Sequence, residues 1–152
     1  MHFYNLIKNL AENQKLQIYV DMDGVIASYD IGKPYDFANK RPLKTNINTL
    51  KKINELKSTE LFILSICKKD NQIKEKNDWL DVNAPFFKKE NRNIISKESH
   101  PNLASKDLKL NYLKSLNTDK QIILIDDDNE IIKTIKDNAK NVILYQDSEL
   151  VD

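Results

Sequence analysis

Five short apolar runs, separated by segments with helical spacing, constrain the fold of this chain more than any other feature. The runs are LQIYV (16–20), LFILSI (61–66), NII (93–95), IILI (122–125) and VILY (142–145). They are continuous rather than alternating, which suits strands that are buried on both faces of a parallel sheet. The sequence therefore predicts about five parallel strands in a sheet that helices cover on both sides.

The gaps between these runs hold apolar residues about one helical turn apart. Ile47 and Leu50 follow this spacing in the first gap, and Ile131 and Ile135 follow it in the last. A chain in which strands and helices alternate folds through right-handed crossovers into a doubly wound sheet. We therefore expect an α/β, three-layer, Rossmann-like fold, formed by a single domain over residues 1–152.

Two segments lie outside this alternation. Apolar residues at near-helical spacing predict an extra helix over residues 1–15, before the first strand. Residues 27–43 form the longest irregular stretch and are expected to be a flap-like loop. Within it, Tyr29, Tyr35 and Phe37 either anchor the loop or provide a partial apolar wall on which a base can stack.

Charge and apolar content narrow the choice of partners. The chain has 24 Lys and Arg against 23 Asp and Glu, a net charge of +1, so we expect no strong nucleic-acid patch. The apolar runs are too short to span a bilayer, and the first residues lack the pattern of a signal peptide. Cys67 is the single cysteine, which excludes an intrachain disulfide and fits a reducing, cytoplasmic location.

Acidic residues end two of the predicted strands. The sequence DMDG (21–24) follows the first run, and DDD (126–128) follows the fourth. The carboxyl ends of parallel strands meet at one edge of the sheet, so we expect these groups to converge there. Converging carboxylates repel one another unless a cation lies among them, and hard oxygen ligands favour Mg²⁺. The acids expected to meet at this edge include Asp21, Asp23, Asp126 and Asp127, so the sequence predicts a metal site there, with Asp127 a candidate to bind the ion directly or through water.

The spacing of Asp21 and Asp23 also suits catalysis. The two acids lie two residues apart, so one can attack a phosphoryl group while the other reaches the leaving oxygen. Gly24 allows a sharp turn there and is a candidate substrate contact. The alternative is that these acids are turn residues, a common role of Asp.

Two residues are expected to cap helices. Asp128 lies at the N-cap position of the helix through Ile131, and Ser105 is a suitable N-cap for the helix that precedes the fourth apolar run.

These segments resemble motifs I, II and IV of the haloacid dehalogenase superfamily. DMDGV follows an apolar strand, Ser65 ends a second strand, and IDDD ends a later one. The resemblance implies a capless phosphatase in which Asp21 attacks phosphorus and becomes phosphorylated. Asp23 would protonate the leaving group and then activate water, and Ser65 would bind a phosphoryl oxygen. Mg²⁺ would be held by Asp21, the backbone carbonyl of Asp23, and Asp126.

The superfamily also implies a motif III lysine, which neutralises charge on the nucleophile and lies near the start of the helix before motif IV. Lys106 is the first choice, Lys109 the second and Lys97 the third. Lys109 shares a helical face with apolar residues. A lysine on the inward face of a helix is unfavourable unless its charge has a role there, which favours Lys109. The stretch after Ser65 is loosely similar to the 5'(3')-deoxyribonucleotidase-like branch, which implies that Lys68 helps to bind phosphate.

Members of the superfamily that have a cap domain carry it in one of two segments, and both segments are short in this chain. About nineteen residues separate Gly24 from Lys44, and only residues 97–104 follow the third strand. An open site either accepts a bulky substrate or takes cover from a loop or another subunit. The leading substrates are a nucleotide, as a small-molecule phosphate ester, and a phosphorylated nucleic-acid end. The oligomeric state stays open.

Two other functions remain open. One is a binding or regulatory protein that keeps the fold without turnover, which the presence of both Asp21 and Asp23 disfavours. The other is a receiver-like signalling module, which also uses a Mg²⁺-bound aspartate at a strand end. Receivers carry a lysine on the last strand, whereas VILYQD has none. Asp23 also points away from dehalogenation, because dehalogenase members lack the second acid of motif I.

Overall fold

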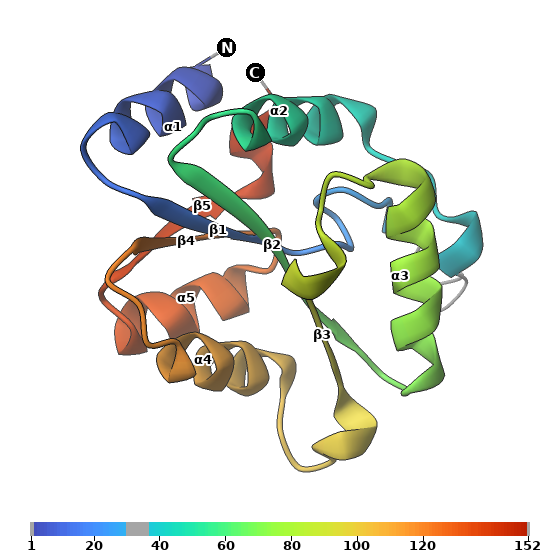
Figure 1. Cartoon of the computed structure of the whole chain (residues 1–152). Helices are drawn as coiled ribbons and strands as arrows, with labels where there is room; N and C mark the ends of the chain where they lie inside the picture. Colours follow the sequence, from blue (N-terminus) through green and yellow to red (C-terminus); the bar gives the residue numbers. More distant parts are fainter. Residues whose placement is uncertain (1, 30–36, 152) are drawn as a thin grey trace.

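A five-stranded parallel sheet forms the centre of the molecule (Figure 1). The structure is a computed structural model that describes residues 2–29 and 37–151. The strands lie in the order β3-β2-β1-β4-β5, and every pairing is parallel. Their bounds are β1 Leu16–Val20, β2 Thr59–Cys67, β3 Arg92–Ser96, β4 Gln121–Asp126 and β5 Val142–Gln146. The predicted α/β, doubly wound sheet is confirmed.

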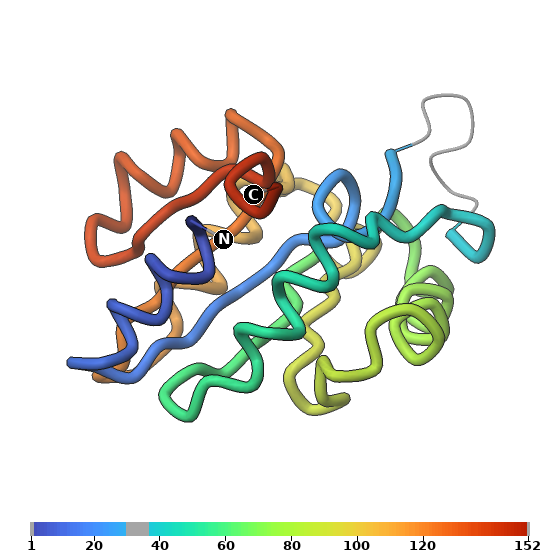
Figure 2. The backbone as a smooth tube through the Cα atoms, turned by 90° about the horizontal axis from the view of Figure 1, so that it is seen from above, coloured from blue at the N-terminus to red at the C-terminus, as the bar shows by residue number. Residues whose placement is uncertain are grey.

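Helices cover both faces of this sheet and make three layers. Their bounds are α1 His2–Asn13, α2 Lys44–Asn54, α3 Asn71–Asn83, α4 Ser105–Ser115 and α5 Asn129–Asn138. Apolar residues of α1, α2 and α3 belong to one buried cluster, and those of α4 and α5 belong to another. In Figure 1, α1 and α2 lie above the sheet, and α4 and α5 lie below it. Seen from above, α1 and α2 run side by side over the strands (Figure 2). The extra helix expected over residues 1–15 is α1.

The first residues of α5 and α4 test the two N-caps predicted from the sequence. Asp128 caps α5, because its side chain accepts hydrogen bonds from the backbone N–H groups of Glu130 (2.9 Å) and Ile131 (3.3 Å). The predicted N-cap is therefore confirmed there. The sequence also suggests Ser105 as the N-cap of α4, and this prediction is wrong. Ser105 is the first residue of α4, and Ala104, which has no side-chain oxygen, holds the N-cap position.

The register of the sheet brings the ends of β1 and β4 to the same edge. Val20 pairs with Ile63 on β2 and with Ile125 on β4. The backbone N–H of Asp21 donates to the carbonyl of Ile125 at 3.0 Å, which fixes Asp21 just beyond β1. Asp126 is the next residue on β4. The two acids therefore end beside each other because the strands that precede them are in register.

The segments where a cap would be inserted hold only short elements within the described ranges. Between β1 and α2 the single-turn helix η1 spans Phe37–Asn39, and between β3 and α4 the single-turn helix η3 spans Lys97–Ser99. This agrees with the expectation of a fold without a separate cap domain. No helix among residues 2–29 and 37–151 has the length and apolar character needed to cross a membrane.

The two ends of the 27–43 segment lie together at the sheet edge. Ala27 forms isolated bridges with Asp23 on one side and with Pro42 on the other. The base of the predicted flap-like loop is therefore fixed to the turn that follows β1. Tyr35, one of the aromatic residues expected to line the loop, lies outside the described residues.

Candidate active site

Three carboxylates converge at the carboxyl edge of the sheet. Asp21 follows β1, Asp126 ends β4, and Asp127 comes next; each offers one oxygen, and these oxygens lie within 4.8 Å of one another. Asp21 and Asp126 are buried. Buried carboxylates this close repel one another, and a cation among them is the compensation that such oxygen ligands favour. The group can therefore hold a metal ion. The role expected for Asp23 concerns its backbone carbonyl and stays a prediction.

A buried lysine joins two of these acids. The ammonium group of Lys109, on α4, donates to Oδ1 of Asp21 at 3.0 Å and to Oδ2 of Asp126 at 2.6 Å. Burial by itself would lower the pKa of Lys109, but the two carboxylates outweigh it and raise the pKa above its ordinary value. Lys109 is therefore a fixed positive charge against the candidate nucleophile.

Lys106, the first choice from the sequence for the motif III lysine, lies elsewhere. Its ammonium group donates to the carboxylate of Glu130 at 2.9 Å, and its side chain is 37% exposed. Lys106 is in the first turn of α4, next to the start of α5, so it finds a partner on the neighbouring helix. Lys109, one turn further along, faces the sheet edge. The structure thus brings the second choice, and not the first, to the carboxylates.

Two of these acids, Asp21 and Asp127, hold their protons more firmly than ordinary acids do. Burial, and then the neighbouring carboxylate of Asp126, raise the pKa of Asp21 well above its usual range, although the Lys109 ammonium opposes them. Burial and the Asp126 carboxylate also raise the pKa of Asp127 to about 6. A cation that binds here has to displace these protons, so metal binding and protonation compete.

We expect the stability of the metal-free protein to fall as the pH rises from about 4, the ordinary carboxyl value, to above 6. Over this range the folded state keeps protons on Asp21 and Asp127 that the unfolded chain has lost. One pKa unit corresponds to about 1.4 kcal/mol, and burial raises the pKa of Asp21 by more than that. Asp21 alone should therefore account for more than about 1 kcal/mol of this loss of stability. Denaturant titrations in EDTA at a series of pH values measure the free energy of unfolding.

Asp21→Asn is the control for this pH dependence, because an amide has no proton to release. The metal-free variant should lose less stability with rising pH than the parental protein, and excess Mg²⁺ should flatten the parental profile. Parallel profiles for the two proteins in EDTA would mean that Asp21 is not buried as an acid.

A tight turn connects Asp21 to the loop that follows it. The carbonyl of Met22 accepts hydrogen bonds from three successive backbone N–H groups, those of residues 25–27. Gly24 has φ +82°, and a Cβ atom built there would overlap the carboxylate of Asp127. Position 24 therefore requires glycine for two reasons. Its backbone is left-handed, and the carboxylate of Asp127 approaches too closely to leave room for a side chain.

Gly24→Ala should destabilise the protein by about 1–3 kcal/mol, from backbone strain and from overlap with Asp127. Urea titration of the two proteins gives the difference. The double variant Gly24→Ala/Asp127→Ala separates the causes, because removal of the carboxylate relieves the overlap but leaves the strain. Strictly additive effects would show that the overlap contributes nothing.

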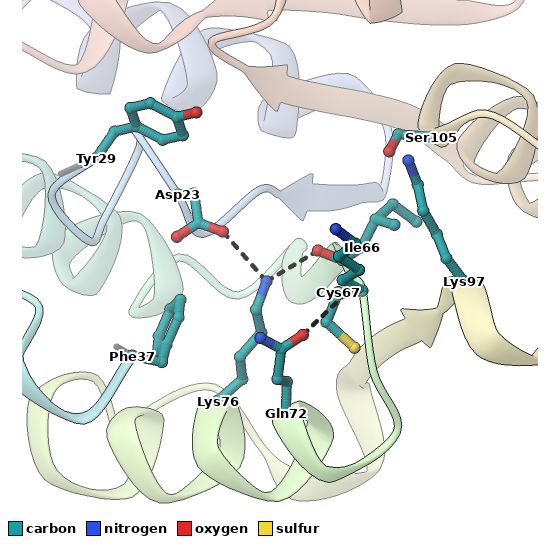
Figure 3. Close-up of a pocket in the computed structure, with 10 residues that line it drawn as sticks. Asp23, Tyr29, Phe37, Ile66, Cys67, Gln72, Lys76, Lys97 and Ser105 are labelled. Carbon is teal, nitrogen blue, oxygen red and sulfur yellow. Dashed lines mark hydrogen bonds and ion pairs between the residues drawn. The ribbon is translucent and has the colours of Figure 1, made fainter. Parts of the chain in front are cut away.

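The carboxylate of Asp23 lies between two buried lysines. The Lys40 ammonium donates to Oδ1 at 2.6 Å, and the Lys76 ammonium donates to Oδ2 at 3.2 Å. Lys40 follows η1 and Lys76 is on α3, so three separate segments meet at this side chain. Figure 3 shows the contact with Lys76. Asp23 is held in one orientation, and its side chain stays 27% exposed.

Lys76 also binds the end of β2. Its ammonium group donates to the hydroxyl of Ser65 at 2.7 Å and to the carbonyl of Ile66 at 3.0 Å. With the bond to Asp23, all three of its protons are used. Ser65, predicted as a phosphate ligand, accepts this bond and so keeps its own proton for another acceptor. Ser65 and Asp23 therefore accept from the same ammonium group.

Lys40 and Lys76 are absent from the residues predicted from the sequence. Lys76 did leave a signal, because it lies three residues after Ile73 and four before Leu80, on the inward face of its helix. The argument that favoured Lys109 applies equally to it. Lys40 lies in an irregular segment, where no periodicity distinguishes an inward lysine from a surface one.

Two adjoining cavities open around Asp23. One, of about 390 Å³, is lined by acids and Lys109, and the other, of about 440 Å³, is lined by lysines. They share Asp23, Tyr29, Ile66 and Ser105. We call the first the acidic hollow; its charged residues are Asp21, Asp23, Asp126, Asp127, Asp128 and Lys109. The second is the basic hollow (Figure 3); its charged residues are Asp23, Lys68, Lys76 and Lys97.

Other predicted residues lie around the basic hollow. Lys68, expected to bind phosphate, lines it and is exposed, and Lys97 lines it and is half-buried. Phe37 is buried and packs edge-on against Trp79, so it anchors its segment, whereas Tyr29 is 61% exposed. Burial raises the pKa of the Cys67 thiol, which agrees with a packed residue rather than a nucleophile.

Comparison with known proteins shows a likeness of fold to solved structures. No family model matches the chain, and no curated protein matches it. A chain in the solved "Structure of Pnkp1/Rnl/Hen1 complex" superposes with a TM-score of 0.68 at 12% sequence identity. The match covers 88% of this chain and 46% of that chain, so this chain spans less than half of its length. At this identity the two share a fold.

Proposed function

We propose that this protein is a Mg²⁺-dependent phosphomonoester hydrolase that works through a phosphoaspartyl intermediate on Asp21. The observation that carries the proposal is the Lys109 ammonium group held between Asp21 and Asp126, with Asp127 beside them. A nucleophilic carboxylate, a fixed cation and a candidate metal group meet at one point. Asp23 lines the same cavity.

In the first step a carboxylate oxygen of Asp21 attacks phosphorus, and the bond from phosphorus to the leaving alcohol breaks. Asp23 enters this step protonated and gives that proton to the leaving oxygen. Lys109 occupies Oδ1 of Asp21, so Oδ2 is the oxygen that attacks. The side chain of Asp21 is 11% exposed and lines the acidic hollow, which lets a phosphoryl group reach it.

In the second step water attacks the same phosphorus atom and the acyl phosphate bond breaks. Asp23 now takes the proton from water, so both acids return to their starting state. The hydroxyl of Ser65 donates to a phosphoryl oxygen, and Lys76 holds that hydroxyl in place. Lys109 neutralises the negative charge that gathers on Asp21 and on the transferred group.

Mg²⁺, when bound, supplies positive charge to the phosphoryl oxygens. Asp21 and Asp126 would hold it, Asp127 would bind it directly or through water, and the backbone carbonyl of Asp23 completes the proposed set. The order of Asp21, Ser65, Lys109 and Asp126 along the chain follows motifs I to IV of the haloacid dehalogenase superfamily. Membership of that superfamily is part of the proposal, and the shared fold described above supports it.

The test is phosphate release from a panel of substrates, with Mg²⁺ and with EDTA. The panel contains 5′- and 3′-nucleoside monophosphates, a 3′-phosphorylated oligonucleotide, sugar phosphates and p-nitrophenyl phosphate. We expect metal-dependent release, fastest from a nucleotide or from the oligonucleotide end. If folded protein that binds Mg²⁺ releases phosphate from none of them, the proposal fails and a binding or regulatory role replaces it.

A further inference from the structure

The two hollows that meet at Asp23 carry opposite charge. In the acidic hollow five carboxylates face one ammonium group, whereas in the basic hollow three ammonium groups face one carboxylate. That carboxylate, Asp23, already pairs with both Lys40 and Lys76. Among the described residues that line the basic hollow, ammonium groups therefore outnumber carboxylates.

Lys97 brings hydrogen-bond donors to this hollow. Lys76 contributes charge but has no proton left to donate, because Ser65, Ile66 and Asp23 use all three. Lys97 is half-buried and has no ion pair with any carboxylate in residues 2–29 and 37–151. In Figure 3 its amino group points into the hollow beside Ser105. A half-buried ammonium group of this kind gains from an anionic partner.

We propose that the basic hollow binds a second phosphate group of the substrate, so the preferred substrate is a nucleotide whose leaving alcohol carries another phosphate. The proposal rests on the proposed function, since the acidic hollow then takes the phosphoryl group that is transferred. Free nucleoside bisphosphates and phosphorylated oligonucleotide ends share this chemistry.

Tyr29 favours a nucleotide over other substrates with two phosphates. It lines both hollows, and its ring is 61% exposed, with the Lys40 ammonium 5.6 Å from the ring centroid. An exposed ring between two phosphate sites offers a face on which a base stacks. Hollows of about 440 and 390 Å³ also fall within the range that binds a small-molecule ligand.

The experiment compares kcat/KM for adenosine 5′-monophosphate, adenosine 3′-monophosphate, adenosine 3′,5′-bisphosphate and a 3′-phosphorylated dinucleotide, with Mg²⁺ present. We expect the substrates with a second phosphate to exceed the better monophosphate by at least about tenfold, the effect of one charge-assisted contact. Comparison of the last two substrates distinguishes a free bisphosphate from an oligonucleotide end. Lys97→Met should bring the ratio close to one.

The ratio separates recognition from chemistry. Loss of a catalytic lysine lowers kcat/KM for all substrates together and leaves the ratio unchanged, whereas loss of a phosphate contact lowers the ratio. Lys51→Met, at an exposed position on α2, is the matched control and should keep both the rates and the ratio.

Failure of the two proposals gives different results. Turnover with equal kcat/KM for monophosphates and bisphosphates would overturn the second-phosphate site while the phosphatase stands. If no substrate is hydrolysed, the same site is measured by calorimetry, where adenosine 3′,5′-bisphosphate should bind tighter than either monophosphate and lose this advantage in Lys97→Met. Equal affinities there would overturn it independently.

Discussion

Asp21→Asn is expected to lower phosphate release by at least about 10⁴-fold, the order of loss that follows removal of a catalytic nucleophile. The amide is nearly the same size as the carboxylate but does not attack phosphorus. Asp21 lies just beyond β1, and its backbone bond to Ile125 does not depend on the side chain. Turnover of p-nitrophenyl phosphate in Mg²⁺ measures the loss.

The fold of this variant provides the control. Asp21→Asn should keep the parental circular dichroism spectrum, and in EDTA above pH 6 it should be more stable than the parental protein, because it no longer buries a carboxylate that repels Asp126. Asp21→Ala, used in parallel, excludes activity recovered by slow hydrolysis of the amide back to aspartate. Parental rates in either variant would refute the phosphoaspartyl mechanism.

Lys109→Met should reduce kcat by at least about 10³-fold and should also destabilise the metal-free protein by about 3–5 kcal/mol. The methionine side chain fills the space of the lysine, so the loss of charge dominates. Without the ammonium group, Asp21 and Asp126 are buried side by side with no cation. Activity assays and urea titrations in EDTA and in Mg²⁺ measure the two effects.

Lys106→Met is the matched control on the same helix. Its lysine forms an exposed pair with Glu130, and such pairs contribute at most about 1 kcal/mol. We expect a near-parental rate and stability. Mg²⁺ should restore part of the stability of Lys109→Met, because the ion replaces the missing charge, and should do nothing comparable for Lys106→Met. Equal effects of the two substitutions would remove Lys109 from its proposed role.

The arrangement of the acids could be predicted because it depends on the sheet. Continuous apolar strands define the parallel sheet, and equal strand register brings Asp21 and Asp126 to one edge. The N-cap of α5 was predictable for a similar reason, since Asp128 acts on backbone groups two and three residues away. Features that depend on where a strand ends or on local hydrogen bonds can be read from the sequence.

Which lysines reach the site was harder to predict than where the acids lie, because lysine side chains are long and their partners lie on other elements. Lys106 and Lys109 are both close to the start of α4, and the packing of α5 against α4 decides which of them reaches the sheet edge. Lys76 has the sequence spacing of an inward-facing residue, but the polar residues around it on α3 obscure that pattern. Lys40 acts from an irregular segment, where sequence spacing carries no information about direction.

The packing of Trp79 gives the protein an optical reporter of its own. This residue is the chain's single tryptophan, and its indole N–H donates to the carbonyl of Lys40 at 2.9 Å. Its ring packs against Phe37, which lines the basic hollow, and the Lys40 ammonium group holds Asp23. Fluorescence excited in the tryptophan absorption band therefore comes from Trp79 alone. Trp79 contacts Lys40, and Lys40 contacts the proposed catalytic residue Asp23. Ligand titrations can be followed by fluorescence in the unlabelled protein.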